Sequence, residues 1–212
     1  MQEDKKEIYC RQFSEDEPEI LKTISRETFA NVLKPRMLSG HYQGRFLSLI
    51  SHLLSPLNIL EIGTYTGYSA ICLSEGLKEG GKVTTIEANE ELQKTILSNF
   101  KNAGVENKIN LIIGSALEKI KELNIKFDLV FIDADKINYS NYYKLIFPKV
   151  NIGGVILSDN VLWDSKVFDL NQNDETTLQI RKFNSILKLD ERTQKIMLPI
   201  RDGLFISRKI KE

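Results

Sequence analysis

Apolar residues follow two different patterns along this chain. Within residues 17–32 and 43–54 they recur at helical spacing, and Pro56 ends the second stretch. From residue 58 onward, short apolar runs alternate with amphipathic stretches, which predicts strands alternating with helices. The predicted strands are residues 58–62, 82–87, 109–113, 127–132 and 154–158, and the predicted helices lie near residues 68–77, 90–103, 116–123 and 139–147.

This alternation predicts an α/β fold. Strands separated by single helices form right-handed βαβ units, so the sheet should be mostly parallel. A last helix at residues 175–189 precedes two extended runs, 193–200 and 204–210. Asp202-Gly203 between them favours a hairpin turn, which would make the final strand pair antiparallel. No repeat or linker divides residues 1–212, so we expect a single domain with an N-terminal helical segment (1–56) and an α/β core (57–212).

Acid and amide side chains come directly after two of the predicted strands. Asp133 follows the strand 127–132, and Asp159 and Asn160 follow the strand 154–158. Taken alone, each is more often a cap or turn residue. Neighbouring parallel strands end at one crevice, however, where two carboxylates and an amide oxygen would suit Mg²⁺, Mn²⁺ or Ca²⁺. Lys136, one turn beyond Asp133, is then a candidate general base.

A glycine-containing turn follows the first predicted strand. Gly63 would allow a tight turn and close approach of a ligand, and Gly67 would open the next helix. Glu87 ends the second strand, where an acid can accept hydrogen bonds from a ribose. The fingerprint G-x-G-x-x-G is absent, which favours a nucleoside without phosphates, although an NAD-dependent oxidoreductase stays open as an alternative.

Composition adds few constraints. Lys+Arg and Asp+Glu both number 29, so the formal net charge is zero, which argues weakly against binding nucleic acid through a global positive field. Two cysteines give neither metal-type spacing nor a disulfide framework. The charged start lacks the apolar centre of a signal peptide, and no stretch is long and apolar enough to span a membrane. We therefore expect a cytoplasmic protein.

Several motifs occur together in a known order: EIGTYTGYS at 61–69, KVTTIE at 82–87, GSAL at 114–117, FDLVFIDADKINY at 127–139, GGVILSDNVLW at 153–163 and DGL at 202–204. With these motifs the chain resembles the cation-dependent class I O-methyltransferases, the family of caffeoyl-CoA and catechol O-methyltransferases. The resemblance implies S-adenosylmethionine (SAM) as methyl donor. It also implies a Rossmann-like, seven-stranded sheet with a reversed C-terminal strand pair and helices on both faces.

The resemblance also implies roles for individual residues. Asp133, Asp159 and Asn160 match the metal ligands of the family, and Lys136 matches its proposed base. Tyr65 or Tyr68 could face the sulfonium of SAM, and Trp163 could form a substrate wall, although simple core packing is an equally good interpretation of each. The residues expected to bind the cofactor are Met37, Ser39, Glu61, Gly63, Tyr65, Tyr68, Ser69, Glu87, Ala88, Ser115, Ala116 and Asp133.

The expected reaction is divalent-metal-dependent methyl transfer to a hydroxyl of a small phenolic acceptor, a catechol- or caffeoyl-like vicinal diol. Residues 195–199 lack the glutamate that the catechol enzyme carries near its substrate, so strict catechol specificity is not expected. A tRNA 5-hydroxyuridine O-methyltransferase stays open as an alternative; it would need a basic pocket mouth, for which the candidates are Arg36, Arg45, Lys136 and Lys166. By resemblance, the protein is expected to form a homodimer.

Overall fold

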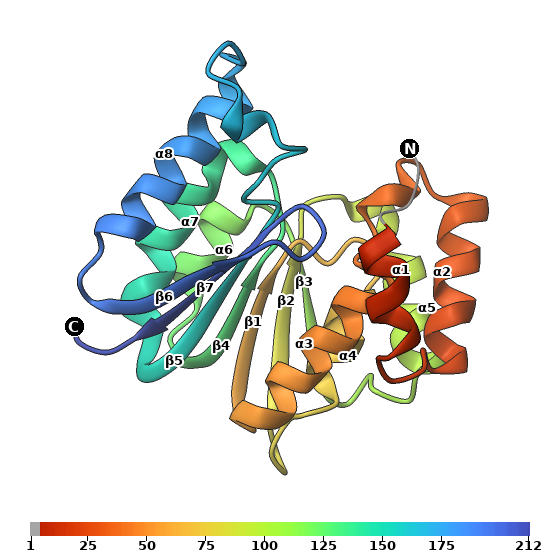
Figure 1. The fold of residues 1–212 in the computed structure, drawn as a ribbon. Helices are drawn as coiled ribbons and strands as arrows, with labels where there is room; N and C mark the ends of the chain where they lie inside the picture. Colours follow the sequence, from red (N-terminus) through yellow and green to blue (C-terminus); the bar gives the residue numbers. More distant parts are fainter. Residues whose placement is uncertain (1–4) are drawn as a thin grey trace.

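The computed structural model describes residues 5–212, so the first four residues of the charged start lie outside the described residues. One sheet of seven strands forms the centre, in the order β3-β2-β1-β4-β5-β7-β6 (Figure 1). β1, β2, β3, β4 and β5 pair in parallel, whereas β7 is antiparallel to both of its neighbours. The strands are β1 (Asn58–Ile62), β2 (Lys82–Glu87), β3 (Ile109–Ile113), β4 (Phe127–Ile132), β5 (Val150–Asp159), β6 (Thr193–Leu198) and β7 (Leu204–Lys209).

Helices cover both faces of this sheet (Figure 1). The helices are α1 (Lys5–Gln12), α2 (Glu19–Asn31), α3 (Gly40–Leu54), α4 (Tyr68–Ser74), α5 (Gln93–Asn102), α6 (Ala116–Glu122), α7 (Tyr139–Ile146) and α8 (Glu175–Leu189). Short 3₁₀ turns occupy Pro35–Met37, Glu90–Leu92, Lys136–Asn138, Phe147–Lys149 and Lys166–Phe168.

The central strands are buried on both faces, which explains their continuous apolar runs. Successive residues of β1 face opposite sides of the sheet, so Ile59 and Leu60 belong to two different cores. The core around Leu60 includes side chains of α6, α7 and α8, and the core around Ile59 includes side chains of α2, α3, α4 and α5. The predicted fold class, including the reversed C-terminal pair, is therefore confirmed.

The elements differ from the predictions mainly at their ends. β5 begins at Val150, four residues before the predicted start, and a register shift opposite residues 127–129 of β4 accommodates the extra length. The predicted helix at 90–103 is a 3₁₀ turn followed by α5. α1 was not predicted, because none of its residues is buried and its apolar positions form no clear stripe. Within residues 5–212, none of the helices has the length and apolar character needed to cross a membrane.

Candidate functional site

A pocket of about 1420 Å³ opens at the carboxyl ends of β1, β2, β4 and β5. In the strand order, β2 and β4 flank β1. The chain therefore leaves β1 and returns to β4 on the other side, and the crevice at such a switch point is where open α/β sheets bind ligands. Residues of the segment between α2 and α3, such as Met37 and Ser39, line the pocket opposite the strand ends.

The turn after β1 requires glycine at two positions. Gly63 has φ +96°, and a Cβ there would lie 1.9 Å from the carbonyl oxygen of Asp133. Gly67 has φ +87°, and a Cβ there would lie 2.5 Å from the ring of Phe100. Because neither neighbour is the end of a flexible side chain, larger residues would displace the turn from β4 and α5.

Glu87 fixes the same turn from the end of β2. Its Oε2 accepts a hydrogen bond from the backbone N–H of Tyr65 at 2.7 Å, and its Oε1 accepts one from the N–H of Asn89 at 2.8 Å. Each carboxylate oxygen has room for a further hydrogen bond. Since Glu87 also lines the pocket, its carboxylate can accept hydrogen bonds from a ligand hydroxyl.

Glu61 lies deeper than the other residues that were predicted to bind the cofactor. Every other predicted cofactor residue lines the pocket, but Glu61 does not, and its side chain is fully buried within the sheet. Its Oε2 accepts a hydrogen bond from Thr85 of β2 at 2.5 Å. Burial raises the pKa of Glu61 to about 8. Direct cofactor binding by Glu61 stays a prediction; its carboxyl lies beneath the turn, next to Ser69, which lines the pocket.

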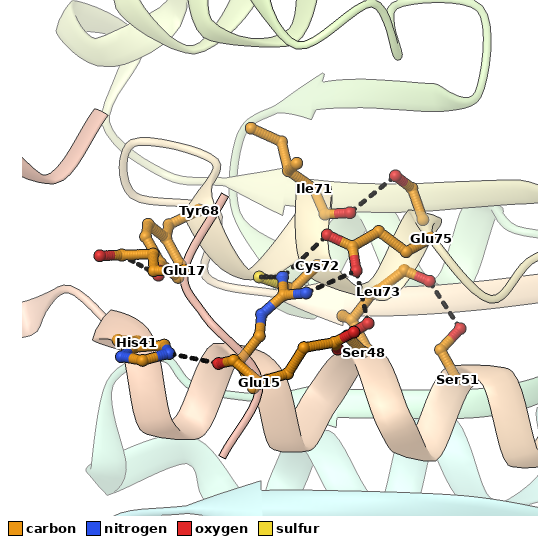
Figure 2. A network of polar contacts seen from close by, with 12 residues as sticks. Glu15, Glu17, His41, Ser48, Ser51, Tyr68, Ile71, Cys72, Leu73 and Glu75 are labelled. Carbon is orange, nitrogen blue, oxygen red and sulfur yellow. Dashed lines mark hydrogen bonds and ion pairs between the residues drawn. The ribbon is translucent and has the colours of Figure 1, made fainter. Parts of the chain in front are cut away.

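A polar network lies behind the turn and joins it to the N-terminal segment (Figure 2). The hydroxyl of Tyr68 donates to Glu17 and so points away from the pocket, although the residue also lines it. Between α3 and α4, Arg45 pairs with both carboxylate oxygens of Glu75, at 2.8 and 3.0 Å. His41 binds the carbonyl of Glu15 at 2.7 Å. Arg45 is therefore a buried structural cation and is not part of a basic pocket mouth.

The predicted acid cluster comes together at the ends of β4 and β5. Asp133, Asp159, Asn160 and Lys136 all line the pocket. The Nζ of Lys136 donates to Oδ1 of Asp133 at 2.8 Å. Asp159 is 2% exposed, and burial raises its pKa to about 6, with the nearby charge of Asp133 adding to the rise.

The carboxylates of this cluster have few hydrogen-bonded cations. The partly buried Asp133 and the buried Asp159 face Lys136, and Arg201 acts on Asp159 only through its charge, because its hydrogen bonds go to Leu38, Ser39 and Gln43. Burial alone would lower the pKa of Lys136, but Asp133, then the Tyr139 hydroxyl and then Asp159 hold it above its usual range. Among residues 5–212, no group of three or more His, Cys, Asp or Glu side chains could hold a metal ion, so a cation here would need the amide of Asn160 as its third ligand. Asn160 comes directly after β5 and has φ +55°, a left-handed backbone conformation that asparagine adopts more readily than most residues. The donor set fits a hard divalent cation.

Sequence reasoning missed Arg201. It lies in the hairpin turn between β6 and β7 with φ +49°, an unusual backbone conformation for a residue with a side chain. Its guanidinium lines the pocket and donates to the carbonyls of Leu38 and Ser39 and to Oε1 of Gln43. The hairpin turn was predicted from Asp202-Gly203, but no local pattern indicates a contact with residues about 160 positions earlier. In the structure, the positive φ of Arg201 is what marks it as a candidate functional residue.

Comparisons with known proteins agree with this site. A profile described as O-methyltransferase matches residues 11–210. The chain is 35% identical to a caffeoyl-CoA O-methyltransferase of Medicago sativa, over 82% of this chain and 76% of that protein. It is also 35% identical to caffeoyl-CoA O-methyltransferase 1 of Arabidopsis thaliana, over 92% of this chain and 79% of that protein.

Solved structures give the same result. An O-methyltransferase from Bacillus cereus in complex with SAH superimposes with a TM-score of 0.88 and 30% identity, covering 96% of each chain. The O-methyltransferase TomG from Streptomyces achromogenes, in complex with SAM, gives a TM-score of 0.89 at 26% identity and covers all of both chains. Family profile, sequence relatives and fold agree: this chain belongs to the O-methyltransferase family and is an enzyme of that class.

Proposed function

We propose that this protein transfers a methyl group from SAM to a hydroxyl of a small aromatic acceptor that carries a second, neighbouring hydroxyl, with the help of a divalent cation. The observation that carries the proposal is the content of one pocket. Gly63 and Glu87, which suit a nucleoside, line the same pocket as the cluster of Asp133, Asp159 and Lys136. Two such sites in one cavity can hold a methyl donor and an acceptor side by side.

Two SAM- or SAH-bound relatives support SAM as the donor for this chain. Gly63 leaves its backbone open to the methionine part, and Glu87 would accept hydrogen bonds from the ribose. Ser115 and Ala116, at the start of α6, would lie against the adenine. Met37 and Ser39 would cover the methionine end, held in place by Arg201.

Asp133, Asp159 and Asn160 would hold the cation, with Mg²⁺ as the first candidate and Mn²⁺ or Ca²⁺ as the others. When bound, a divalent cation lowers the pKa of the acceptor hydroxyl and offsets the excess negative charge of the two carboxylates. A phenol has an ordinary pKa near 10, so little oxyanion exists at neutral pH without such help.

Lys136 would take the proton from the acceptor hydroxyl in its neutral form, which a bound cation would favour by offsetting the charges of Asp133 and Asp159 that raise its pKa. Its Nζ lies in the pocket beside Asp133, so it can reach a hydroxyl placed next to that carboxylate. The acceptor oxygen then attacks the methyl carbon, the carbon–sulfur bond breaks, and its electron pair stays on sulfur. The products are the methyl ether, S-adenosylhomocysteine and a proton on Lys136. Most of the rate gain would come from alignment of the two substrates.

The acceptor class rests on the relatives, two of which are named caffeoyl-CoA O-methyltransferases. Trp163 lines the pocket and has an indole N–H without a hydrogen-bond partner among the described residues, so it could contact an acceptor by stacking and by donation. Lys34 and Arg36 are exposed at the rim and would suit an acceptor with an anionic end.

Neither alternative gains support from the comparisons. Of the four candidates for the basic pocket mouth that the tRNA alternative required, Arg36 and Lys136 line the pocket, whereas Arg45 is buried against Glu75 and Lys166 does not line it. The oxidoreductase alternative has no counterpart in the family profile.

We also propose that two copies of the chain associate. Tyr9 and Phe13 at the N-terminal end are 63% and 75% exposed and stack on each other at 4.6 Å. Exposed aromatic side chains of this kind favour a protein contact. Sedimentation equilibrium of the full chain tests this: a dimer supports it and a monomer at micromolar concentration contradicts it.

The direct test is methyl transfer from SAM to a catechol-type acceptor, measured in Mg²⁺ and again after EDTA. We expect product only with the cation, and loss of product in Asp133→Ala. Asp128→Asn is a control at the other end of the same strand, because Asp128 is the second residue of β4 and its carboxylate accepts hydrogen bonds from the backbone N–H groups of Leu57 and Asn58, away from the pocket. Equal methylation with and without EDTA would exclude the metal-dependent mechanism, and methylation of bulk tRNA alone would change the substrate class.

A further inference from the structure

Tyr139, the first residue of α7, lies directly behind the acid cluster. It is fully buried, and its ring packs edge-on against Phe183 with centroids 5.3 Å apart. Tyrosine hydroxyls that are buried this deeply need hydrogen-bond partners. The partners of Tyr139 are the last residues of two strands and one lysine.

The hydrogen bonds fix the direction in which this hydroxyl donates. Tyr139 Oη lies 3.2 Å from the carbonyl oxygen of Ile132 and 3.1 Å from that of Asp159. Carbonyl oxygens only accept hydrogen bonds, so the phenol proton points towards them. The phenol oxygen is therefore left to accept from Lys136 Nζ, which lies 2.7 Å away.

Lys136 is held by two acceptors of different kinds. One is Oδ1 of Asp133 at 2.8 Å, and the other is the phenol oxygen of Tyr139. Asp133 is also a proposed ligand of the cation, so its carboxylate would bind both the cation and Lys136. Tyr139 is not a proposed ligand of the cation, and its buried ring packs against Phe183. Its hydrogen bond to Lys136 does not compete with cation binding.

We propose that Tyr139 is a positioning residue for the methyl transfer. The Nζ of Lys136 has three positions around it besides its bond to Cε. Asp133 and Tyr139 occupy two of them, so the third is directed into the pocket, where the acceptor hydroxyl would lie. Tyr139 also ties the ends of β4 and β5 together, which keeps Asp133 and Asp159 at a fixed separation. This inference rests on the proposed function.

Two other tyrosines of α7 provide the comparison. Tyr142 donates to Asp135, and Tyr143 donates to Asp190 at 2.9 Å. Tyr143 is buried in the core, like Tyr139, and does not line the pocket. Tyr143→Phe therefore removes one hydroxyl from the same helix without touching Lys136, and it serves as the matched control for Tyr139→Phe.

The first readout is steady-state kinetics with SAM and a catechol-type acceptor. We expect Tyr139→Phe to lower kcat about tenfold, a part of the 10²–10⁴ that general base catalysis supplies, while the KM values change by less than about twofold. We expect Tyr143→Phe to keep the wild-type kcat. The deficit of Tyr139→Phe should shrink with a nitro-substituted catechol, because a more acidic hydroxyl depends less on the base.

The second readout needs no activity. Trace acetylation of the metal-free protein, analysed by mass spectrometry, reports how freely the Lys136 amine moves. We expect labelling of Lys136 to rise several-fold in Tyr139→Phe and to stay unchanged in Tyr143→Phe. Thermal unfolding of both variants checks that each is folded.

The outcomes separate the two proposals. If the wild type shows no metal-dependent methylation, the proposed function itself is contradicted. An active wild type whose Tyr139→Phe variant keeps full kcat, or loses the same factor with both acceptors, overturns the role of Tyr139 alone. Unchanged labelling of Lys136 in Tyr139→Phe overturns it as well.

Discussion

Two buried clusters of charged side chains contain similar residues but differ in how far the chain itself satisfies them. Between α3 and α4, one arginine meets one glutamate: Arg45 binds both oxygens of Glu75, and Ser48 donates to the same carboxylate at 2.5 Å (Figure 2). At the ends of β4 and β5, two carboxylates meet one lysine. The first cluster is electrically balanced and the second is not.

This difference separates a structural cluster from a functional one. Burying a charge costs several kcal/mol unless a partner and hydrogen bonds compensate for it. Glu75 has such compensation. Asp159 has less, and its pKa stays raised by burial and by the charge of Asp133 although Lys136 and Arg201 act to lower it. A cluster that the protein leaves unbalanced at the end of a pocket is suited to a ligand that completes it.

Removing a carboxylate from the unbalanced cluster should have the largest effect on activity. We expect Asp159→Asn to lower kcat/KM by about 100-fold or more, since a catalytic cation is worth several kcal/mol. Stability should stay equal or rise, because the substitution removes repulsion with Asp133. Steady-state kinetics and thermal unfolding of the variant, next to Asp128→Asn, measure both. A large loss of stability in Asp159→Asn would mean that this cluster is structural.

The balanced cluster should respond in the opposite way. Arg45→Met leaves the carboxylate of Glu75 without its partner and should destabilise the fold by about 2–3 kcal/mol, while the kcat of the folded enzyme stays the same. Urea unfolding gives the stability change. The double variant Arg45→Met/Glu75→Gln should recover part of it, because no unpaired charge remains. Loss of kcat in a folded Arg45→Met variant would contradict the separation of the two clusters.

Arg201 links the hairpin to the pocket wall, so its effect should lie in cofactor binding. Arg201→Gly removes the hydrogen bonds to Leu38, Ser39 and Gln43 and leaves a backbone that suits φ +49°. We expect SAM to bind about tenfold more weakly, equivalent to roughly 1.4 kcal/mol, by isothermal titration. Arg208→Ala, in the same hairpin but bound to Gln194, should leave the affinity unchanged. Equal weakening in both variants would assign the effect to the hairpin as a whole.

The smallest effect is expected from a balanced pair near the surface. Arg192 holds the pKa of Asp190 down to about 2, with Tyr143 donating to the same carboxylate. A lowered pKa means that this carboxylate stabilises the fold above its unfolded-state pKa and loses that contribution as the pH falls towards 2. Because Arg192 is 43% exposed, Asp190→Asn should cost about 1 kcal/mol at most at pH 7. Urea unfolding should show that difference narrowing below about pH 4; a constant difference at all pH values would contradict it.

The sequence predicted those parts of the molecule that depend on local patterns. Apolar runs marked the strands, and the acid and amide residues that end β4 and β5 marked one wall of the pocket. Contacts between distant segments could not be predicted. Glu61 and Glu87 lie on the same face of the sheet, because Glu61 pairs with Thr85, two residues before Glu87. Glu61 lies inside β1, however, whereas Glu87 ends β2, and only the register of the folded strands decides which carboxylate reaches the pocket. The same holds for Arg201, whose partners lie on the N-terminal segment. The single-domain organisation and the homodimer stay predictions.

Thermal unfolding with added Mg²⁺ or Mn²⁺ tests the unbalanced cluster most directly, since it needs neither SAM nor an acceptor. A cation that binds only the folded protein stabilises it by about 2.7 kcal/mol at 100 times its Kd. We predict that the midpoint of the wild type and of Asp128→Asn rises with cation concentration and saturates, whereas that of Asp159→Asn does not move. The assignment of Asp133, Asp159 and Asn160 as a cation site would be contradicted by either of two results. One is a wild-type unfolding midpoint that does not change with either cation up to millimolar concentration, and the other is an equal rise of the midpoint in Asp159→Asn.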